Sequence, residues 1–232
     1  MPSILITGSN RGLGLEWAQQ YGREGWRVYA TCRHPAEATS LQQLSREHAN
    51  LTIHRMDVTR QDEIQALAAE LRNDAIDILL NNAGVYLEKF EDDIGTHLSY
   101  DDWLQTLLVN TLGAMRVTEA FIEHVARGKQ RLVIAITSHM GSIAEISSPG
   151  SYYYRSSKAA LNASMKGLSL ELKPRGIGVL LLHPGWVQTR MGGPGAQIGT
   201  AQSVGGMRSI IERFHLADTG RFFRYNGTEI PW

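Results

Sequence analysis

The sequence has one cysteine, Cys32, no excess charge of either sign and no long uninterrupted apolar run. A single cysteine excludes an internal disulfide and a cysteine-based metal site, and it favours a reducing compartment. Lysine plus arginine equals aspartate plus glutamate at 23 each, so no overall field draws the chain to nucleic acid or to an anionic membrane. No segment reaches the roughly 18 to 20 apolar residues of a membrane span, and the first residues do not resemble a signal peptide. These absences predict a cytoplasmic protein with a small-molecule partner and no metal, membrane or nucleic acid.

Short aliphatic runs alternate with longer amphipathic segments along the chain. The runs expected to form buried parallel strands are 4–7, 27–32, 51–56, 76–81, 132–137 and 179–183. The segments expected to form helices are 13–23, 36–48, 61–71, 103–126 and 154–172. This alternation predicts one α/β domain over residues 1–232, a Rossmann-type doubly wound parallel sheet that binds ligands at the carboxyl ends of its strands. The glycine-rich segment 191–206 follows the last of these strands and is predicted to be a lid.

The segment Thr-Gly-Ser-Asn-Arg-Gly-Leu-Gly at residues 7–14 follows the first expected strand and opens the first helix. Gly8 permits a tight exit from the strand, Gly12 lets the backbone approach a pyrophosphate, and Gly14 allows the helix to pack closely on the sheet. The spacing differs from the Gly-x-Gly-x-x-Gly of the general dinucleotide fingerprint, and the glycines would also fit a plain turn. Their position between a strand and a helix favours a phosphate-binding turn.

The second expected strand ends at residues 32–34, where an NAD site usually carries an acidic residue. Arg33 is instead suited to the 2′-phosphate of NADP(H), and Arg11 in the glycine turn is placed to share that charge. Both arginines would otherwise be ordinary solvated surface residues. After the third strand, Asp57 and Val58 are placed to meet an adenine, although Asp57 would also serve as a helix cap.

Tyr154 and Lys158 form a Tyr-x-x-x-Lys pattern on an expected helix, where residues four apart share one face. The ammonium of Lys158 would favour the ionised form of the Tyr154 phenol and make it a usable acid or base near neutral pH. So short a pattern also occurs by chance, and its surroundings must decide. Ser138 ends an upstream strand, where its hydroxyl would bond the same substrate oxygen or only local backbone. Asn110 lies inside a long helical pattern, which disfavours asparagine and indicates a specific hydrogen-bonding role.

Two further strand ends carry small and polar residues. The segment 81–84, Asn-Asn-Ala-Gly, ends the fourth strand and is also typical of a turn. His183 ends the sixth strand and is interpreted as a strand-end residue rather than a catalyst, because Tyr154 already fills the proton-transfer role. Residues 184–189 then turn the chain, and Thr189 is able to bind the carboxamide of a nicotinamide cofactor.

The chain resembles the short-chain dehydrogenase/reductase family across nearly its whole length, because its motifs occur in the order typical of that family. In chain order, these motifs are the glycine turn, Asp57, the 81–84 segment, Asn110, Ser138, Tyr154 with Lys158, and Pro184-Gly185. Within the family it is similar to the sniffer-type carbonyl reductase and C-factor branch. The segments that carry this narrower likeness are 140–143, 154–162, 183–187 and 225–232.

The resemblance implies a reductase that transfers hydride from NADPH to the carbonyl of a small aldehyde or ketone. Tyr154 would donate a proton to the carbonyl oxygen, and Ser138 would orient that carbonyl. Lys158 would lower the pKa of the tyrosine and bind the nicotinamide ribose, and Asn110 would hold a water in a proton relay. The residues that the resemblance and the strand ends together assign to the cofactor are Gly8, Asn10, Arg11, Gly12, Leu13, Gly14, Arg33, Asp57, Val58, Asn82, Ala83, Gly84, Tyr154, Lys158, Pro184, Gly185, Val187 and Thr189.

Two departures from the family pattern affect the substrate side of the site. Ser138 and Tyr154 are sixteen residues apart, a little more than usual in the family, and Thr137 stands where a second serine is common. The longer loop, 142–153, is expected to form one wall of the substrate pocket. The expected mouth of that pocket consists of Tyr86, Met140, Tyr152, Trp186 and Met191, which predicts a preference for apolar carbonyls.

Two other hypotheses about function compete with that of a reductase. A signalling or redox-sensing protein could keep the fold and the cofactor, but it would not need the four catalytic residues. A nucleotide-sugar epimerase would normally need an added substrate domain, for which 232 residues leave no length. The family also implies a homodimer or larger homo-oligomer built on the helices at 103–126 and 154–172.

Overall fold

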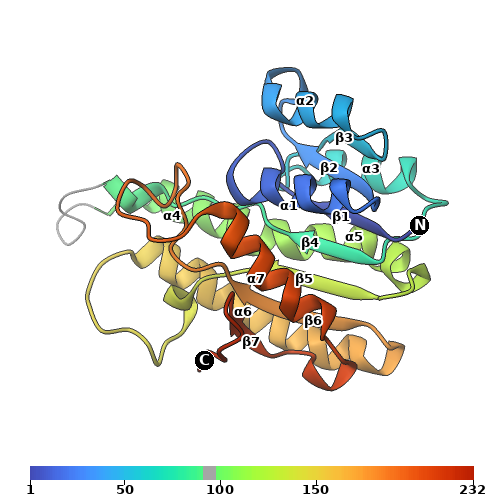
Figure 1. The fold of residues 1–232 in the computed structure, drawn as a ribbon. Helices are drawn as coiled ribbons and strands as arrows, with labels where there is room; N and C mark the ends of the chain where they lie inside the picture. The colour runs from blue at the N-terminus through green and yellow to red at the C-terminus, as the bar shows by residue number, and fades with distance from the viewer. Residues whose placement is uncertain (91–97) are drawn as a thin grey trace.

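The computed structural model describes residues 1–90 and 98–232 of the chain. Within these residues, seven strands form one parallel sheet in the order β3-β2-β1-β4-β5-β6-β7 (Figure 1). The strands are β1 (Ser3–Ile6), β2 (Arg27–Cys32), β3 (Leu51–Arg55), β4 (Ile78–Asn81), β5 (Leu132–Ile136), β6 (Gly178–His183) and β7 (Phe222–Arg224). The chain builds outward from β1 to β3 and then from β4 to β7 in the other direction. The strand order therefore reverses between β1 and β4, as expected for a doubly wound sheet.

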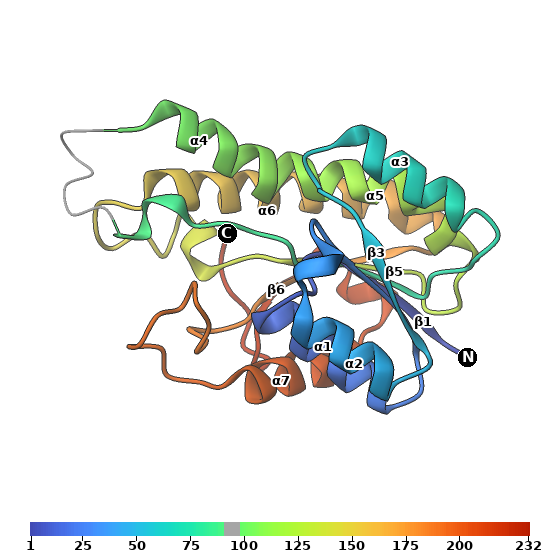
Figure 2. The same ribbon diagram turned by 90° about the horizontal axis from the view of Figure 1, so that it is seen from above.

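Helices cover both faces of the sheet, as Figure 2 shows. The helices are α1 (Gly12–Arg23), α2 (Thr39–Glu47), α3 (Gln61–Glu70), α4 (Tyr100–Leu107), α5 (Ala114–Arg127), α6 (Tyr152–Leu172) and α7 (Thr200–Glu212). One layer contains α1, α2 and α7; the other contains α3, α5 and α6, with α4 packed along α6. None of the helices in the described part of the chain is both long and apolar enough to cross a membrane.

The alternation of side chains along each strand divides the core into two apolar clusters. In β1, Leu5 faces the layer of α3, α5 and α6, whereas Ile4 and Ile6 face the layer of α1, α2 and α7. All three side chains are fully buried. Because both faces are covered, the central strands β1, β4, β5 and β6 are apolar apart from their end residues, which is why short aliphatic runs identified them in the sequence.

The structure adds one strand and one helix that the sequence pattern did not predict. β7 is only three residues long, too short to show a periodicity. α7 contains Gly205 and Gly206, and a side chain at Gly206 would lie 2.4 Å from the carbonyl oxygen of Tyr225. Glycine therefore permits close packing of α7. The glycine content of this segment is also typical of loops, which is why the helix was not predicted. The expected lid at 191–206 is consequently loop only as far as Gly199, and residues 200–206 begin α7.

The single long helix expected at 103–126 is interrupted. α4 and α5 are joined by a π-helical segment, η3 (Leu108–Gly113), which contains Asn110. A π-helical turn holds one more residue than an α-helical turn and is frequently found at functional sites. The break therefore occurs at the residue that the sequence pattern had marked as unfavourable for a helix.

Candidate active site

The polar residues at the ends of β1, β4, β5 and β6 lie along one edge of the sheet. Thr7, which follows β1, accepts hydrogen bonds at Oγ1 from the backbone amides of Asn82 and Ala83, both at 2.9 Å. Asn82 in turn donates from Nδ2 to the carbonyl oxygens of Thr7 and Gly8, at 2.8 and 3.2 Å. These hydrogen bonds join the glycine turn at 7–14 to the end of β4. The 81–84 segment therefore supports the glycine turn.

The glycine turn has the geometry that its sequence predicts. Gly8 and Gly12 have φ values of +71° and +55°, which side-chain-bearing residues rarely adopt. A Cβ at Gly14 would lie 2.1 Å from the carbonyl oxygen of Gly8, so this position tolerates no side chain. A Cβ at Gly12 would lie 3.3 Å from Cγ2 of Thr189, which brings the loop after β6 against the glycine turn. Two of the expected cofactor segments are therefore neighbours in space.

The two arginines assigned to the 2′-phosphate are both exposed. Within the described residues, neither the Arg11 nor the Arg33 side chain forms a hydrogen bond or an ion pair, so both guanidinium groups are free. Arg11 is the N-terminal cap residue of α1 and makes no side-chain capping bond, and the first turn of α1 carries no acidic residue. No acidic residue in the first turn of α1 therefore offsets the positive end of this helix, which suits a phosphate.

Asp57 supports a turn rather than capping a helix. Its Oδ1 accepts hydrogen bonds from the amide and the hydroxyl of Thr59, at 2.9 and 2.8 Å. The cap residue of α3 is Arg60, so the capping alternative that the sequence left open is wrong. Val58 is buried, and a Cβ on Gly113 would lie 2.9 Å from its Cγ2, which places the Asp57-Val58 turn against the end of η3.

Tyr154 and Lys158 lie on α6 and are both buried, with 9% and 4% of their surface exposed. Nζ of Lys158 donates a 2.9 Å hydrogen bond to the carbonyl oxygen of Ile136, the last residue of β5, and lies 5.8 Å from the centroid of the Tyr154 ring. Ser138 follows β5 two residues later, and its hydroxyl is close enough to Tyr154 to act on the pKa of the phenol. The three residues that the sequence predicted to act together are therefore brought together.

Asn110 joins this group through the π-helical segment. Its Oδ1 accepts a 2.8 Å hydrogen bond from the amide of Val85, and its Nδ2 donates to the Val85 carbonyl oxygen and to Oγ of Ser157, each at 2.9 Å. A Cβ added to Gly84 would lie 3.3 Å from Oδ1 of Asn110 and 3.7 Å from Nζ of Lys158. Asn110 thus has the specific hydrogen-bonding role predicted for it, and it ties the segment after β4 to α6.

Burial controls the proton affinities of Tyr154 and Lys158. Burial raises the pKa of Tyr154 to about 12, and the hydrogen bond from Ser138 opposes this increase only in part. Burial also lowers the pKa of Lys158 to about 8, because the charged amine loses its hydration. The sequence predicted that Lys158 lowers the pKa of Tyr154, whereas the net shift in the structure is upward and is dominated by burial. Tyr154 consequently keeps its proton at neutral pH, as a proton donor must.

Two residues near the site are structural. Oγ1 of Thr137 donates to Oδ1 of Asn162 on α6 at 2.6 Å, so it fastens the strand end to the helix. His183 is buried, and burial lowers its pKa to about 3. Its ring lies 4.8 Å from that of His139, and it stays neutral near physiological pH. Its interpretation as a strand-end residue rather than an acid catalyst agrees with this environment.

The loop expected to form a wall of the substrate pocket is held by residues that the sequence did not suggest. Glu145 in this loop pairs with Arg224 of β7 and with His139. The amide of Ala144 donates a 3.1 Å hydrogen bond to the carbonyl oxygen of Trp232. Arg224 and Trp232, in and after β7, therefore hold this loop, although they lie 79 and 88 positions further along the chain than Glu145 and Ala144.

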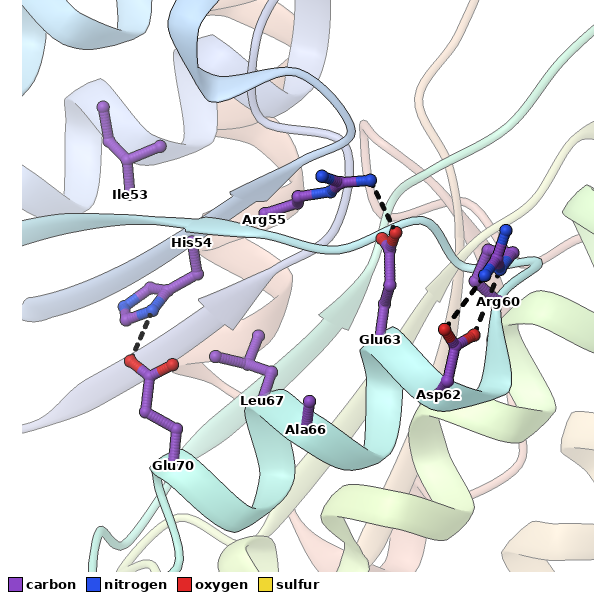
Figure 3. Close-up of a pocket in the computed structure, with 9 residues that line it drawn as sticks. All are labelled: Ile53, His54, Arg55, Arg60, Asp62, Glu63, Ala66, Leu67 and Glu70. Carbon is purple, nitrogen blue, oxygen red and sulfur yellow. Dashed lines mark hydrogen bonds and ion pairs between the residues drawn. The ribbon is translucent and has the colours of Figure 1, made fainter.

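A separate surface hollow of about 590 Å³ lies beside β3 and α3 (Figure 3). Its acidic and basic side chains already pair with one another: Arg55 with Glu63, Arg60 with Asp62, and His54 with Glu70. These charged groups are therefore already partnered within the protein. The hollow therefore does not compete with the strand ends as the candidate active site.

The fold and the buried Ser-Tyr-Lys group define a class of protein, the nicotinamide-dependent oxidoreductases with a Rossmann-type sheet. Comparison with known families makes this narrower. Residues 2–197 match the family model described as short chain dehydrogenase. The chain belongs to the short-chain dehydrogenase/reductase family.

Individual relatives are similar over most or all of the chain. C-signal from Myxococcus xanthus is 43% identical over 169 residues, which are 73% of this chain and 100% of that protein. The 1-hydroxy-2-glutathionyl-2-methyl-3-butene dehydrogenase of a Rhodococcus species is 32% identical over 240 residues, 100% of both proteins. These two relatives show that the likeness is not confined to the glycine turn.

Solved structures show the same agreement in three dimensions. The NADPH-bound carbonyl reductase from chicken fatty liver superposes with a TM-score of 0.92 at 31% identity, covering 100% of this chain and 99% of that one. Carbonyl reductase Sniffer of D. melanogaster superposes with a TM-score of 0.91 at 32% identity, covering 100% of both. The predicted doubly wound fold and the predicted family, including its sniffer-type branch, are confirmed.

The buried amine of Lys158 makes a testable contribution to stability. Its pKa is about 8 in the folded protein and 10.5 ordinarily, so between these values the unfolded chain binds a proton that the folded protein does not. Stability contributed by this group is therefore complete above the ordinary pKa and is lost as the pH falls towards 8. We expect the free energy of unfolding of the wild type, relative to Lys158→Met, to rise by on the order of 2 kcal/mol between about pH 8 and pH 10. Urea unfolding of both proteins at each pH measures this, and a difference that does not change with pH would contradict it.

Proposed function

We propose that this protein is an NADPH-dependent carbonyl reductase that acts on small aldehydes and ketones. The observation that carries the proposal is the buried group of Tyr154, Ser138, Lys158 and Asn110, in which each member contacts another part of the same site. A proton donor beside a serine hydroxyl suits a carbonyl oxygen that gains negative charge during reduction. Carbonyl reductases among the similar solved structures support the same activity.

The residues present fit NADP(H). The uncapped N-terminus of α1 and the positive-φ glycines offer a place for the pyrophosphate, and the free guanidinium groups of Arg11 and Arg33 suit the 2′-phosphate. Two similar structures, from chicken fatty liver and Burkholderia multivorans, are described with bound NADPH or NADP. The cofactor would supply the hydride.

Residues of the protein would supply the proton that the substrate carbonyl oxygen gains. Ser138 and Tyr154 would both hydrogen-bond the substrate carbonyl oxygen, and Tyr154 would give up its phenolic proton as negative charge grows on that oxygen. The ammonium of Lys158 would stabilise the resulting phenolate from the same side of α6. Asn110, held by Val85 and Ser157, would keep the adjoining backbone in place for reprotonation of the tyrosine through water.

Tyr154→Phe removes the proton donor and keeps the ring. We expect carbonyl reduction to fall by at least ~10²-fold, the usual contribution of general acid catalysis, while NADPH binding persists. Tyr100→Phe, at an exposed tyrosine of α4, is the matched control and should retain wild-type activity. Steady-state kinetics and NADPH fluorescence titration measure both properties. More than half of the wild-type activity in Tyr154→Phe would remove Tyr154 from the mechanism.

Arg33 provides a test of cofactor choice. One charged hydrogen bond to the 2′-phosphate, weakened by exposure to solvent, should give roughly tenfold higher kcat/KM with NADPH than with NADH. In Arg33→Asp the carboxylate would repel the phosphate and accept hydrogen bonds from the free ribose hydroxyls, so the preference should narrow sharply or invert. Arg46→Asp, at an exposed arginine of α2, makes the same change of charge away from the turn and should leave the ratio unchanged. The ratio is measured at two salt concentrations because salt screens surface charges. A wild type that favours NADH would refute the assignment.

Exposed apolar residues lie in the segments that adjoin Ser138, Tyr154 and Gly185 along the chain. Ile143 and Ile146 lie in the loop after Ser138, Tyr152 lies one residue before the buried Tyr153-Tyr154 pair, and Trp186 follows Gly185. Exposed apolar residues that gather beside polar catalytic groups are typical of sites for apolar ligands. We propose apolar or aromatic carbonyl compounds as the substrate class.

An aromatic aldehyde should therefore give at least ~10-fold higher kcat/KM than a charged keto acid of similar size, because it is costly to bring a carboxylate out of water against apolar side chains. Ile143→Asp should lower kcat/KM for the aldehyde, whereas Leu170→Asp, at an exposed leucine far along α6, should not. Steady-state assays with both substrates provide the comparison. A clear preference for the keto acid would exclude this substrate class.

A signalling role is the second candidate, and the observation that favours it is the 43% identity to C-signal. A protein that only bound NADP(H) would not need a buried Ser-Tyr-Lys group, which favours catalysis. The homo-oligomer, the cytoplasmic location and the lid at 191–199 stay predictions. Exposed Leu104 and Leu112 lie on the α4 and η3 segment that such an oligomer would use.

A further inference from the structure

The first turn of α6 has an unusual capping arrangement. The first backbone amides of any helix have no partner within the helix, and the residue before the helix usually accepts from one of them with its side chain. Here that residue is Ser151, which has a left-handed φ of +56° and makes no side-chain capping bond. Oγ of Ser151 instead forms a 2.5 Å hydrogen bond with the hydroxyl of Tyr86.

A distant carboxylate takes over the capping role. Glu88 lies in the short helix η2 (Leu87–Phe90), and its Oε2 and Oε1 accept hydrogen bonds from the amides of Tyr153 and Tyr154, at 2.8 and 3.0 Å. Only 1% of the surface of Glu88 is exposed. Burying a carboxylate is costly unless strong hydrogen bonds and a favourable field compensate for it. Two amide donors at the positive end of a helix of 21 residues provide both.

The same short segment also contacts the side chain of the catalytic tyrosine. The ring of Tyr86 stacks on the ring of Tyr154, with centroids 4.3 Å apart and planes inclined by 18°. Tyr86 therefore fixes the plane of the Tyr154 ring, while Glu88 fixes its backbone amide. Ring and backbone together determine where the phenolic oxygen lies relative to Ser138.

We propose that Glu88 is a positioning residue for catalysis: its buried carboxylate fixes the first turn of α6 and so aligns the Tyr154 phenol with Ser138 and the substrate oxygen. This inference rests on the proposed carbonyl reductase activity. A displacement of a reacting group by about 1 Å can lower a rate by about 10²-fold, so a carboxylate that never touches substrate can still control turnover.

Two substitutions separate this role from a general effect on folding. Glu88→Gln keeps the shape and one acceptor oxygen, so one of the two bonds survives, whereas Glu88→Ala removes both. We expect kcat to fall about 10-fold in Glu88→Gln and about 100-fold in Glu88→Ala, with KM for the carbonyl and the Kd for NADPH within about twofold of wild type. Glu171→Gln, at an exposed glutamate near the other end of α6, is the control and should match wild type.

Amide hydrogen exchange provides a readout that does not depend on turnover. In Glu88→Gln the amides of Tyr153 and Tyr154 should exchange at least ~10-fold faster than in wild type, because one acceptor is lost. Amides in the middle of α6, such as that of Leu161, should exchange at the wild-type rate. A merely structural role would instead accelerate exchange along the whole helix and lower the midpoint of thermal unfolding.

The outcomes separate the two proposals. Wild-type protein that reduces no carbonyl with NADPH overturns the proposed function, while faster local exchange in the Glu88 variants would still establish the anchoring of α6. Wild-type kcat in Glu88→Ala, or unchanged exchange at Tyr153 and Tyr154, overturns the positioning role. If Glu88→Ala does not fold, Glu88→Gln decides, and failure of that variant to fold as well would also overturn the proposal, because the carboxylate would then serve the fold as a whole.

Discussion

The structure depends on one constraint: the parallel strands at the centre of the sheet must end at the same edge, with both of their faces buried. Side chains within the strands are then apolar, and polar chemistry is confined to the residues that follow them. Thr7 after β1 and Asn82 after β4 bond to each other across this edge. Lys158 reaches the last carbonyl oxygen of β5 from α6, two residues before Ser138. That bond fixes the register of α6 against β5.

The same burial sets the chemistry of the site. An amine and a phenol in an apolar interior both favour their neutral forms, which explains why the pKa of Lys158 falls to about 8 and that of Tyr154 rises to about 12. A protonated tyrosine suits the reduction of a carbonyl, in which the protein gives a proton away. The reverse reaction needs the phenolate, and additional positive charge beside Tyr154 would have to stabilise it.

Much of this architecture could be predicted from the sequence, because its signals are local. Six of the seven strands in the described residues coincide with segments predicted as strands, and the glycine turn, Tyr154 and Lys158 are close in sequence to the elements that hold them. What could not be predicted depends on contacts between distant segments. Gly206 permits α7 to pack against Tyr225, so a helix looked like a loop. Glu88 caps a helix 65 residues further along the chain, and no sequence pattern predicts a contact over such a separation. The direction of the Tyr154 pKa shift was also missed, because burial cannot be measured from a motif.

Transfer of hydride to a carbonyl carbon is the central claim of this account, and isotope labelling tests it most directly. An aromatic aldehyde is incubated with the protein and NADPH that carries deuterium at the transferable position of the nicotinamide, and the alcohol is analysed by mass spectrometry and proton NMR. The account predicts one deuterium in the alcohol, on the carbon that was the carbonyl carbon. An alcohol without deuterium at that carbon, or no alcohol at all, would contradict it.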